Sequence, residues 1–167
     1  GKDIASKTLN IPSRGFYLYV KPTDRGRFVK LAEDAINGRK NRLFLSMQIC
    51  NNINELLRNF EGLVPVSEDM NGTPYNVIIR SESIVTDRRQ YYIDLPEGRR
   101  GSFLRITLLE THSAILNSVV LPLEGIGPLH HALDSILDDY GRRFLDEAPY
   151  LRHSLMIRTD AKRFFFD

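Results

Sequence analysis

An aromatic side chain followed two positions later by a cation occurs at two corresponding places in the sequence. Phe28 precedes Lys30, and Phe103 precedes Arg105. Aromatic rings stack on unpaired bases, and neighbouring cations attract phosphates, so the affinity of such a surface falls as salt is added. If both pairs lie on the solvent-facing side of a strand, they predict a surface for single-stranded nucleic acid.

Each pair follows a short basic loop that contains glycine. The first loop is Arg25-Gly26-Arg27 and the second is Arg99-Arg100-Gly101. A register error of one residue would instead place Phe28 and Phe103 in the core. The residues alone leave both interpretations open, because duplication preserves a core phenylalanine as well as a binding one.

The two pairs belong to an internal repeat. Residues 14–31 and 89–106 both read as basic, aromatic hairpins, and a constant shift of 75 aligns them. After one inserted residue the shift becomes 76 and continues into a stretch with helical spacing. A match of this length with a single gap indicates duplication. Residues 159–167, TDAKRFFFD, resemble residues 86–94, TDRRQYYID, and predict the opening of a third copy.

Periodicity predicts four strands followed by a helix in each copy. In the strand after the first basic loop, alternation puts Val29 and Leu31 on the core face and Phe28 and Lys30 on the opposite face. The period changes near Asn52, where a capping-box pattern predicts the start of a helix.

The second helix is predicted from a clearer stripe of apolar residues. Pro128 suits its first turn, and Gly141 is placed to end it. Because one copy of this size buries little core, two copies are expected to pack as one α+β domain.

Charge is distributed unevenly along the chain, although the net charge is only +2. Residues 14–42 carry eight Lys/Arg against three Asp/Glu, whereas residues 124–140 carry four acids and no Lys or Arg. The acids therefore fall on the predicted helices and the bases on the strands. This pattern leaves one sheet face free to be basic and aromatic.

Catalytic signatures are scarce. The sequence contains no phosphate-binding loop, no nucleophile elbow and no HExxH zinc motif, so neither an enzyme nor a cofactor or metal site is expected. The single cysteine, Cys50, cannot form an internal disulfide and suits a reducing compartment. No apolar run approaches the length of a membrane span, and no membrane partner is expected.

Several segments resemble a known family. DIASKTLNI, RGFYLYVK, RGRFVKLAE and NGRKNRLFLSM resemble the first repeat of the Pur-alpha family of purine-rich element binding proteins. RRQYYIDLPEGRRGSFLRI and LDSILDDYG resemble the second repeat, and KRFFFD resembles the opening of the third. The resemblance divides the chain into a first repeat (4–60), a connector (61–75), a second repeat (76–141), and a linker with the truncated start of a third repeat (142–167).

The resemblance implies a fold and a function. Two ββββα repeats intertwine into one PUR domain, similar to the Whirly proteins, with antiparallel sheets and helices packed on one face. Such a domain binds single-stranded DNA and RNA rich in purine, GGN-like tracts, and is associated with local strand separation. The third repeat of the full-length protein forms a homodimer. Family members act in transcription, replication and mRNA transport, in nucleus and cytoplasm.

The resemblance also assigns site residues. A Lys-x-Asn-x-basic pattern of the family falls on Lys21, Thr23 and Arg25, so its Asn is lost, and Pro96 and Gly98 replace both Lys and Asn in the second repeat. Phe28 and Phe103 stand at base-stacking positions, and Ser13 retains half of a Gln-Ser pair. The candidate nucleic-acid-binding residues are Ser13, Lys21, Thr23, Arg25, Arg27, Phe28, Lys30, Arg100, Phe103 and Arg105.

A protein-interaction scaffold is the alternative from another class. In that interpretation the basic face meets an acidic partner, and residues 159–167 dock on a sheet edge to mediate self-association. Binding to single-stranded and to double-stranded nucleic acid distinguishes the two hypotheses, since a scaffold has no reason to prefer the single strand.

Overall fold

The computed structural model describes residues 2–12, 14–24, 26–34, 40–61, 77–86, 88–97, 103–110, 115–145, 150–158 and 163–166. At positions 40, 59–61, 77–81, 95–97, 103, 115–116, 150–158 and 163–166 it describes the backbone alone. The predicted connector, residues 61–75, lies outside the described residues except for the end of the first helix.

The first unit forms a four-stranded antiparallel sheet in the order β1-β2-β3-β4. Its strands are β1 (Ala5–Leu9), β2 (Gly15–Thr23), β3 (Gly26–Asp34) and β4 (Lys40–Ser46). Val29 and Leu31 are buried, whereas Phe28 and Lys30 remain partly exposed. The predicted register of β3 is therefore confirmed, and Phe28 is not a core residue of this sheet.

The second sheet has six antiparallel strands in the order β10-β9-β5-β6-β7-β8. Its strands are β5 (Val77–Val85), β6 (Arg89–Glu97), β7 (Phe103–Glu110), β8 (Ile115–Pro122), β9 (Tyr150–Arg158) and β10 (Arg163–Phe166). β5 to β8 are the four strands predicted for the second copy. The β9–β10 hairpin extends this sheet beyond β5.

The pairing of β5 with β9 has a local two-fold character. Ser81 lies opposite Ser154 at the centre of nine paired positions. The same shift of 73 that relates residues 86–94 to residues 159–167 also relates these two serines. β5 and β9 are therefore equivalent strands of two repeated hairpins, and they pair antiparallel with the equivalent residues Ser81 and Ser154 opposite each other.

The first helix, α1 (Met47–Glu61), begins earlier than the capping-box pattern predicted. The Ser46 hydroxyl accepts a hydrogen bond from the Ile49 backbone N–H at 3.2 Å, which is the geometry of a helix N-cap. Asn52 lies inside the helix, where its side-chain oxygen accepts from Gln48 at 2.9 Å. The predicted start at Asn52 is wrong because a serine at the strand end supplies the cap.

The second helical segment changes its winding along its length. A 3-10 turn η1 (Leu123–Gly125) leads into α2 (Ile126–Ile136), and a π-helical turn η2 (Leu137–Gly141) follows. Gly141 ends that turn, and a further 3-10 turn η3 (Arg142–Phe144) continues the chain. Among the described residues, none of the helices combines the length and apolar character needed to cross a membrane.

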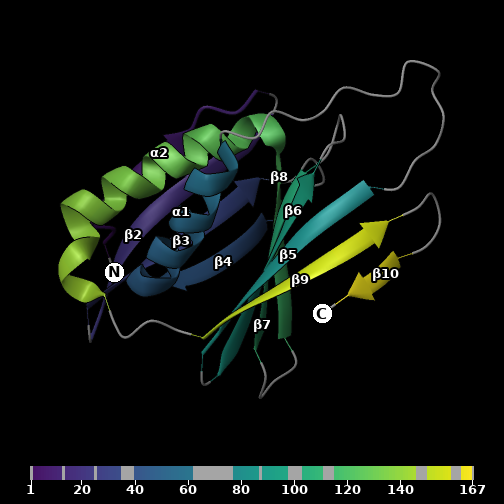
Figure 1. Cartoon of the computed structure of the whole chain (residues 1–167). Helices are drawn as coiled ribbons and strands as arrows, with labels where there is room; N and C mark the ends of the chain where they lie inside the picture. The colour runs from purple at the N-terminus through teal and green to yellow at the C-terminus, as the bar shows by residue number, and fades with distance from the viewer. Residues whose placement is uncertain are drawn as a thin grey trace.

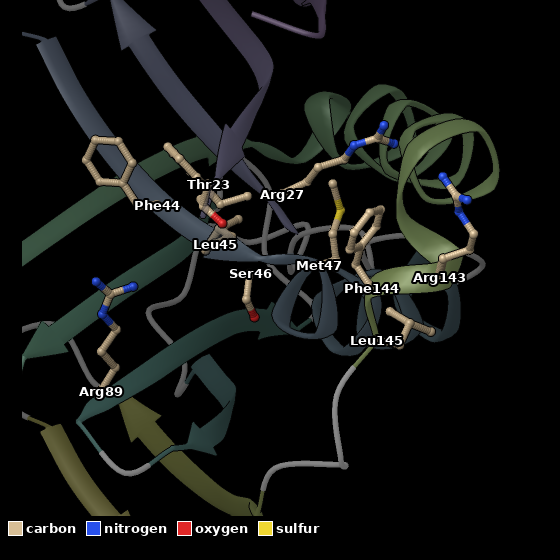
Figure 2. A pocket seen from close by; sticks show the side chains of 11 residues that line it. Thr23, Arg27, Phe44, Leu45, Ser46, Met47, Arg89, Arg143, Phe144 and Leu145 are labelled. Atoms are coloured by element: carbon tan, nitrogen blue, oxygen red, sulfur yellow. The ribbon is translucent and has the colours of Figure 1, made fainter. Parts of the chain in front are cut away.

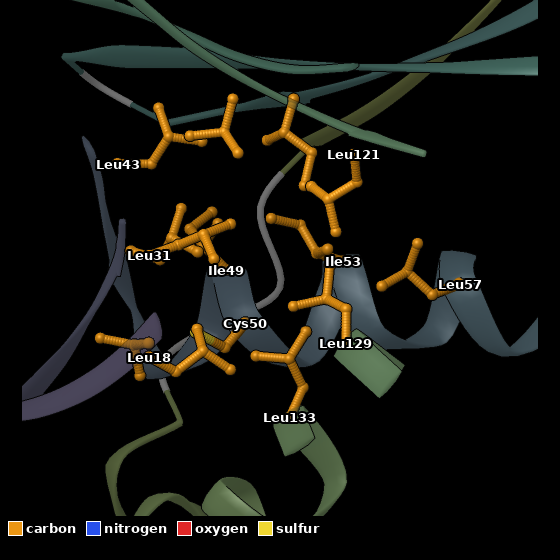
Figure 3. Packing of buried hydrophobic residues seen from close by; sticks show 14 of the residues in the cluster. Leu18, Leu31, Leu43, Ile49, Cys50, Ile53, Leu57, Leu121, Leu129 and Leu133 are labelled. Carbon is orange, nitrogen blue, oxygen red and sulfur yellow. The ribbon is translucent and has the colours of Figure 1, made fainter. Parts of the chain in front are cut away.

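The two units share one core. α1 lies against β3 and β4, while α2 lies against β1, so the helix of the second unit covers the sheet of the first (Figure 1). Side chains from both helices and both sheets converge in that core (Figure 3). They include Leu18, Leu31, Leu43, Ile53, Leu57, Leu121, Leu129 and Leu133. The predicted α+β fold of two ββββα units in one domain is confirmed.

The two sheets meet where β4 runs beside β8. The Tyr91 hydroxyl of β6 donates a hydrogen bond to the Phe44 backbone carbonyl of β4 at 3.2 Å. Burial raises the pKa of Tyr91, which keeps this phenol protonated and able to donate at neutral pH. The second sheet therefore helps to fix the position of β4.

Candidate nucleic-acid interface

Aromatic and basic side chains alternate across the solvent-facing side of the first sheet. The strand register places Tyr19 opposite Lys30, and Lys30 opposite Phe44. The Lys30 Nζ lies 4.5 Å from the centre of the Tyr19 ring. We call this surface the strip, and it consists of Tyr17, Tyr19, Lys21, Phe28, Lys30 and Phe44.

The rings of the strip contact one another in pairs. Tyr17 and Tyr19 stack with ring centres 6.4 Å apart, and Phe28 and Phe44 meet at 5.7 Å with their planes tilted by 57°. Phe44 is 38% exposed, and among the phenylalanine side chains that the structure describes it alone is classed as exposed. The strip therefore exposes aromatic rings to solvent beside a cation.

Each end of the strip lies beside a carboxylate group. The negative charge of Asp34 raises the pKa of Tyr17, with smaller contributions from desolvation and from a hydrogen bond to the same carboxylate. At the other end, Lys21 Nζ contacts Asp3 at 2.6 Å and lies 5.9 Å from the Tyr19 ring centre. Lys30, between these ends, is the cation most directly framed by aromatic rings.

A pocket of about 640 Å³ opens beside the strip. Figure 2 shows Phe44 and Arg89 at one end of this pocket and Phe144 and Arg143 at the other. Its walls come from the first sheet, the first residue of α1, the start of β6 and the chain after η2. The lining residues are Thr23, Arg27, Phe28, Phe44, Leu45, Ser46, Met47, Arg89, Arg143, Phe144 and Leu145.

Arg27 holds two walls of this pocket together. Its Nη1 donates to the Tyr140 backbone carbonyl at 2.9 Å, and its guanidinium lies 5.0 Å from the centre of the Phe144 ring. A cation that bonds the last carbonyls of a helix stabilises that helix end. Arg27, which the sequence suggested as a nucleic-acid ligand, thus connects the β2–β3 hairpin to the second helix.

The structure brings only some of the candidate residues together. Thr23, Arg27 and Phe28 line the pocket, while Lys21 and Lys30 lie on the strip. Arg105 is exposed on β7, where it lies opposite Asp94 and is not part of the pocket lining. Ser13, Arg25 and Arg100 lie outside the described residues, as does the side chain of Phe103.

Several residues of this region were missed from the sequence. They are Tyr19 and Phe44 of the strip and Arg89, Arg143 and Phe144 of the pocket, and Tyr17 of the strip was missed as well. Phe44 carried a usable signal, because it stands between the buried Leu43 and Leu45 in an alternating strand. The two arginines gave no local signal, since only tertiary packing brings β6 and η3 to the first sheet.

A polar network joins the two helices behind the site. The buried His130 Nδ1 lies 2.7 Å from Asn54 Oδ1, and Asn54 donates to Asp134 at 2.6 Å. Desolvation opposes ionisation of Asp134, but the Asn54 hydrogen bond and the electrostatic interactions with His130 and Arg58 outweigh it and lower the pKa of Asp134. Within the described residues, no group of three His, Cys, Asp or Glu side chains gathers at metal-binding spacing.

Comparison with known proteins places the chain in a family. The family model described as PurA single-stranded DNA- and RNA-binding protein matches residues 1–167. The chain belongs to this family of single-stranded DNA- and RNA-binding proteins.

The curated relatives are named as regulators of transcription. The transcriptional activator protein Pur-alpha is 34% identical over 179 residues in both Mus musculus and Homo sapiens. Transcriptional regulator protein Pur-beta of Danio rerio is 32% identical over 202 residues. These alignments cover 99% of this chain, but only 55% of the two Pur-alpha proteins and 68% of the Pur-beta protein. The chain thus spans little more than half the length of its Pur-alpha relatives.

Proposed function

We propose that this chain binds single-stranded DNA and RNA through the strip, with a preference for purine-rich, GGN-like tracts. The observation that carries the proposal is the position of Lys30, which lies between Tyr19 and Phe44 across three neighbouring strands. Rings at these positions can stack on unpaired bases while the ammonium group contacts a phosphate. A duplex hides its base faces and gives such rings nothing to stack on.

Binding to labelled oligonucleotides, followed by fluorescence anisotropy, tests the proposal. Lys30→Ala and Phe44→Leu should each weaken binding to a single-stranded GGN repeat, and Phe44→Leu should do so by about fivefold or more. The matched control is Lys2→Ala, which removes the same charge from an exposed position outside the strip. The free energy of unfolding of each of the three variants should lie within about 0.5 kcal/mol of that of the parent protein, since the changed side chains are at the surface.

Two further oligonucleotides test whether the protein prefers single strands to duplexes and purines to pyrimidines. A pyrimidine strand should bind more weakly than the GGN repeat, and a duplex of the same sequence more weakly still. Equal binding of the duplex, together with no effect of Lys30→Ala or Phe44→Leu, would contradict the proposal. That result would favour the protein-interaction scaffold, in which the basic face serves an acidic partner.

The proposal extends to the organisation of the chain. Residues 4–60 and 76–141 are the two repeats of one domain, residues 61–75 connect them, and residues 142–167 contain the opening of a third repeat. The pairing of Ser81 with Ser154 supports this division, because it relates β5 and β9 as equivalent strands. Homodimerisation through a complete third repeat belongs to the same proposal.

The cellular role is proposed from the family. A single-strand binder of this kind suits regulation of transcription, with local duplex destabilisation, and also replication and mRNA transport. Such roles place the protein in both nucleus and cytoplasm. A helicase-type strand-displacement assay with a partly melted duplex tests the destabilising activity separately from binding.

A further inference from the structure

We infer that the pocket beside the strip holds one nucleotide of the bound strand, with its base between aromatic rings and its phosphates on Arg89 and Arg143. This inference rests on the proposed function and adds a site to it. The site includes Arg89 of β6 and Arg143 and Phe144 of η3, which belong to a different unit from the strip.

The apolar walls of the pocket suit a flat ring. Phe28 and Phe44 meet at 5.7 Å on one side, and Phe144 stands across the pocket from Phe44 (Figure 2). Leu45, Met47 and Leu145 complete the apolar lining. A base that leaves the strip can enter here and exchange solvent for ring faces, which is favourable for any base and strongest for a purine.

The charges of the lining favour an anion. Arg27, Arg89 and Arg143 line the pocket, and the lining contains no Asp or Glu. Arg27 is held by the Tyr140 carbonyl and by the Phe144 ring, so its role is to hold the walls of the pocket together. Arg89 and Arg143 remain as the cations that can contact phosphates at the two ends.

The contacts that Arg89 and Arg143 make leave both side chains able to bind a phosphate. The ion pair of Arg89 with Glu110 is 3.5 Å long, and the Arg89 side chain is 41% exposed. Arg143 lies with its guanidinium 5.7 Å from the centre of the Phe144 ring and is exposed. A guanidinium has five donors in a planar fork, so such partners leave N–H groups for a phosphate.

Size and position also fit a nucleotide. The volume of about 640 Å³ lies within the ~300–1,000 Å³ of typical small-ligand sites. The hydroxyls of Thr23 and Ser46 line the pocket and can meet the polar edge of a base. Phe28 and Phe44 belong to both the strip and the pocket, so a strand crossing β2, β3 and β4 reaches the pocket directly.

The chain offers matched pairs of arginine variants for the test. Arg88 and Arg142 are exposed neighbours of Arg89 and Arg143, and neither lines the pocket. In anisotropy titrations with a single-stranded GGN repeat, Arg89→Ala and Arg143→Ala should bind more weakly than Arg88→Ala and Arg142→Ala. Each pocket variant should also reduce the slope of log affinity against log salt by about 0.7, the value for one lost phosphate contact on a single strand. Thermal melting of all four variants checks that they are folded.

Fluorescence of 2-aminopurine tests entry of the base. The analogue replaces one purine at a time along the oligonucleotide, with the parent protein and with Phe144→Leu. We expect one position to respond differently from its neighbours in the parent protein, and to lose that response in Phe144→Leu while overall binding through the strip persists.

The outcomes separate this inference from the proposed function. If Lys30→Ala weakens binding but the pocket arginine variants behave like their controls, the pocket is not a nucleotide site and the strip alone binds. A uniform 2-aminopurine response along the strand would overturn base entry in the same way. If the parent protein binds no oligonucleotide at low salt, the proposed function fails and the pocket inference fails with it. Binding of an acidic aromatic peptide that Arg89→Ala and Arg143→Ala abolish, with no oligonucleotide binding, would assign the pocket to a protein partner.

Discussion

Phe144, which follows the helix of the second unit, packs directly on Gly26 in the hairpin of the first. A Cβ atom added at Gly26 would lie 2.7 Å from the Phe144 ring. Gly26 also has a φ of 146°, a conformation that residues with side chains rarely adopt. This contact joins the two units at the wall of the pocket, so local backbone geometry and domain assembly depend on the same glycine.

Gly26→Ala should therefore destabilise the whole domain. Backbone strain at such a φ costs about 1–3 kcal/mol, and the clash with the Phe144 ring adds to it. Chemical denaturation of the parent and the variant measures the loss. The double variant Gly26→Ala/Phe144→Ala separates the two causes, because removing the ring relieves the clash and leaves the strain. A fully stable Gly26→Ala would show that this hairpin does not dock on Phe144.

The stability of the protein should fall in acid partly through Asp134. Its pKa lies below the ordinary 3.8, so the ionised carboxylate stabilises the fold above that pH. This contribution is lost as the pH falls through the lower value of the folded state. Asp134→Asn should flatten the dependence of unfolding free energy on pH below about 4, whereas Asp139→Asn, at an exposed position nearby, is the control. Equal slopes in both variants would exclude Asp134 as the titrating group.

Much of the fold follows from local sequence patterns. Alternation in β3 correctly assigned Val29 to the core and Phe28 to the opposite face, because the period of a strand is fixed by its backbone. The helix start was wrong because Ser46 ends a strand and caps a helix at once, while the capping-box pattern at Asn52 was the more visible signal. Ser46 is thus both the last residue of β4 and the residue that caps α1.

The site was harder to predict because it is assembled from distant segments. Lys30 and Phe28 are local to one hairpin and were found, but Phe44 depends on the pairing of β3 with β4. Arg89 and Phe144 reach the pocket only after the two units pack together. Sequence spacing contains no direct record of that packing, so the lining residues outside the first unit could not be predicted from it; they are Arg89, Arg143, Phe144 and Leu145.

Cys50 should react with thiol reagents only when the protein unfolds. It is fully buried in the core, and burial raises the pKa of its thiol, so little reactive thiolate exists in the native state. The reaction rate with an aromatic disulfide reagent should rise with denaturant in parallel with the loss of circular dichroism. Fast native reaction, with circular dichroism unchanged, would place Cys50 at a site that opens without global unfolding.

Ser46 allows stability and binding to be separated in one position. Its hydroxyl caps α1 by accepting from the Ile49 N–H at 3.2 Å, and it also lines the pocket. Ser46→Ala should cost about 1 kcal/mol of unfolding free energy through loss of the cap, and it should weaken oligonucleotide binding only by the loss of one neutral hydroxyl contact. Ser46→Asp keeps a capping oxygen but introduces a negative charge into a lining that has none.

Ser46→Asp should therefore retain most of the stability of the parent and bind single strands more weakly, because its carboxylate repels phosphates and pairs with nearby arginines. Denaturation and anisotropy measured on the same samples give the two quantities. Added salt should narrow the difference in affinity between Ser46→Asp and the parent, since screening weakens charge repulsion. If Ser46→Asp binds as tightly as the parent at low salt while remaining folded, the pocket contains no phosphate of the bound strand.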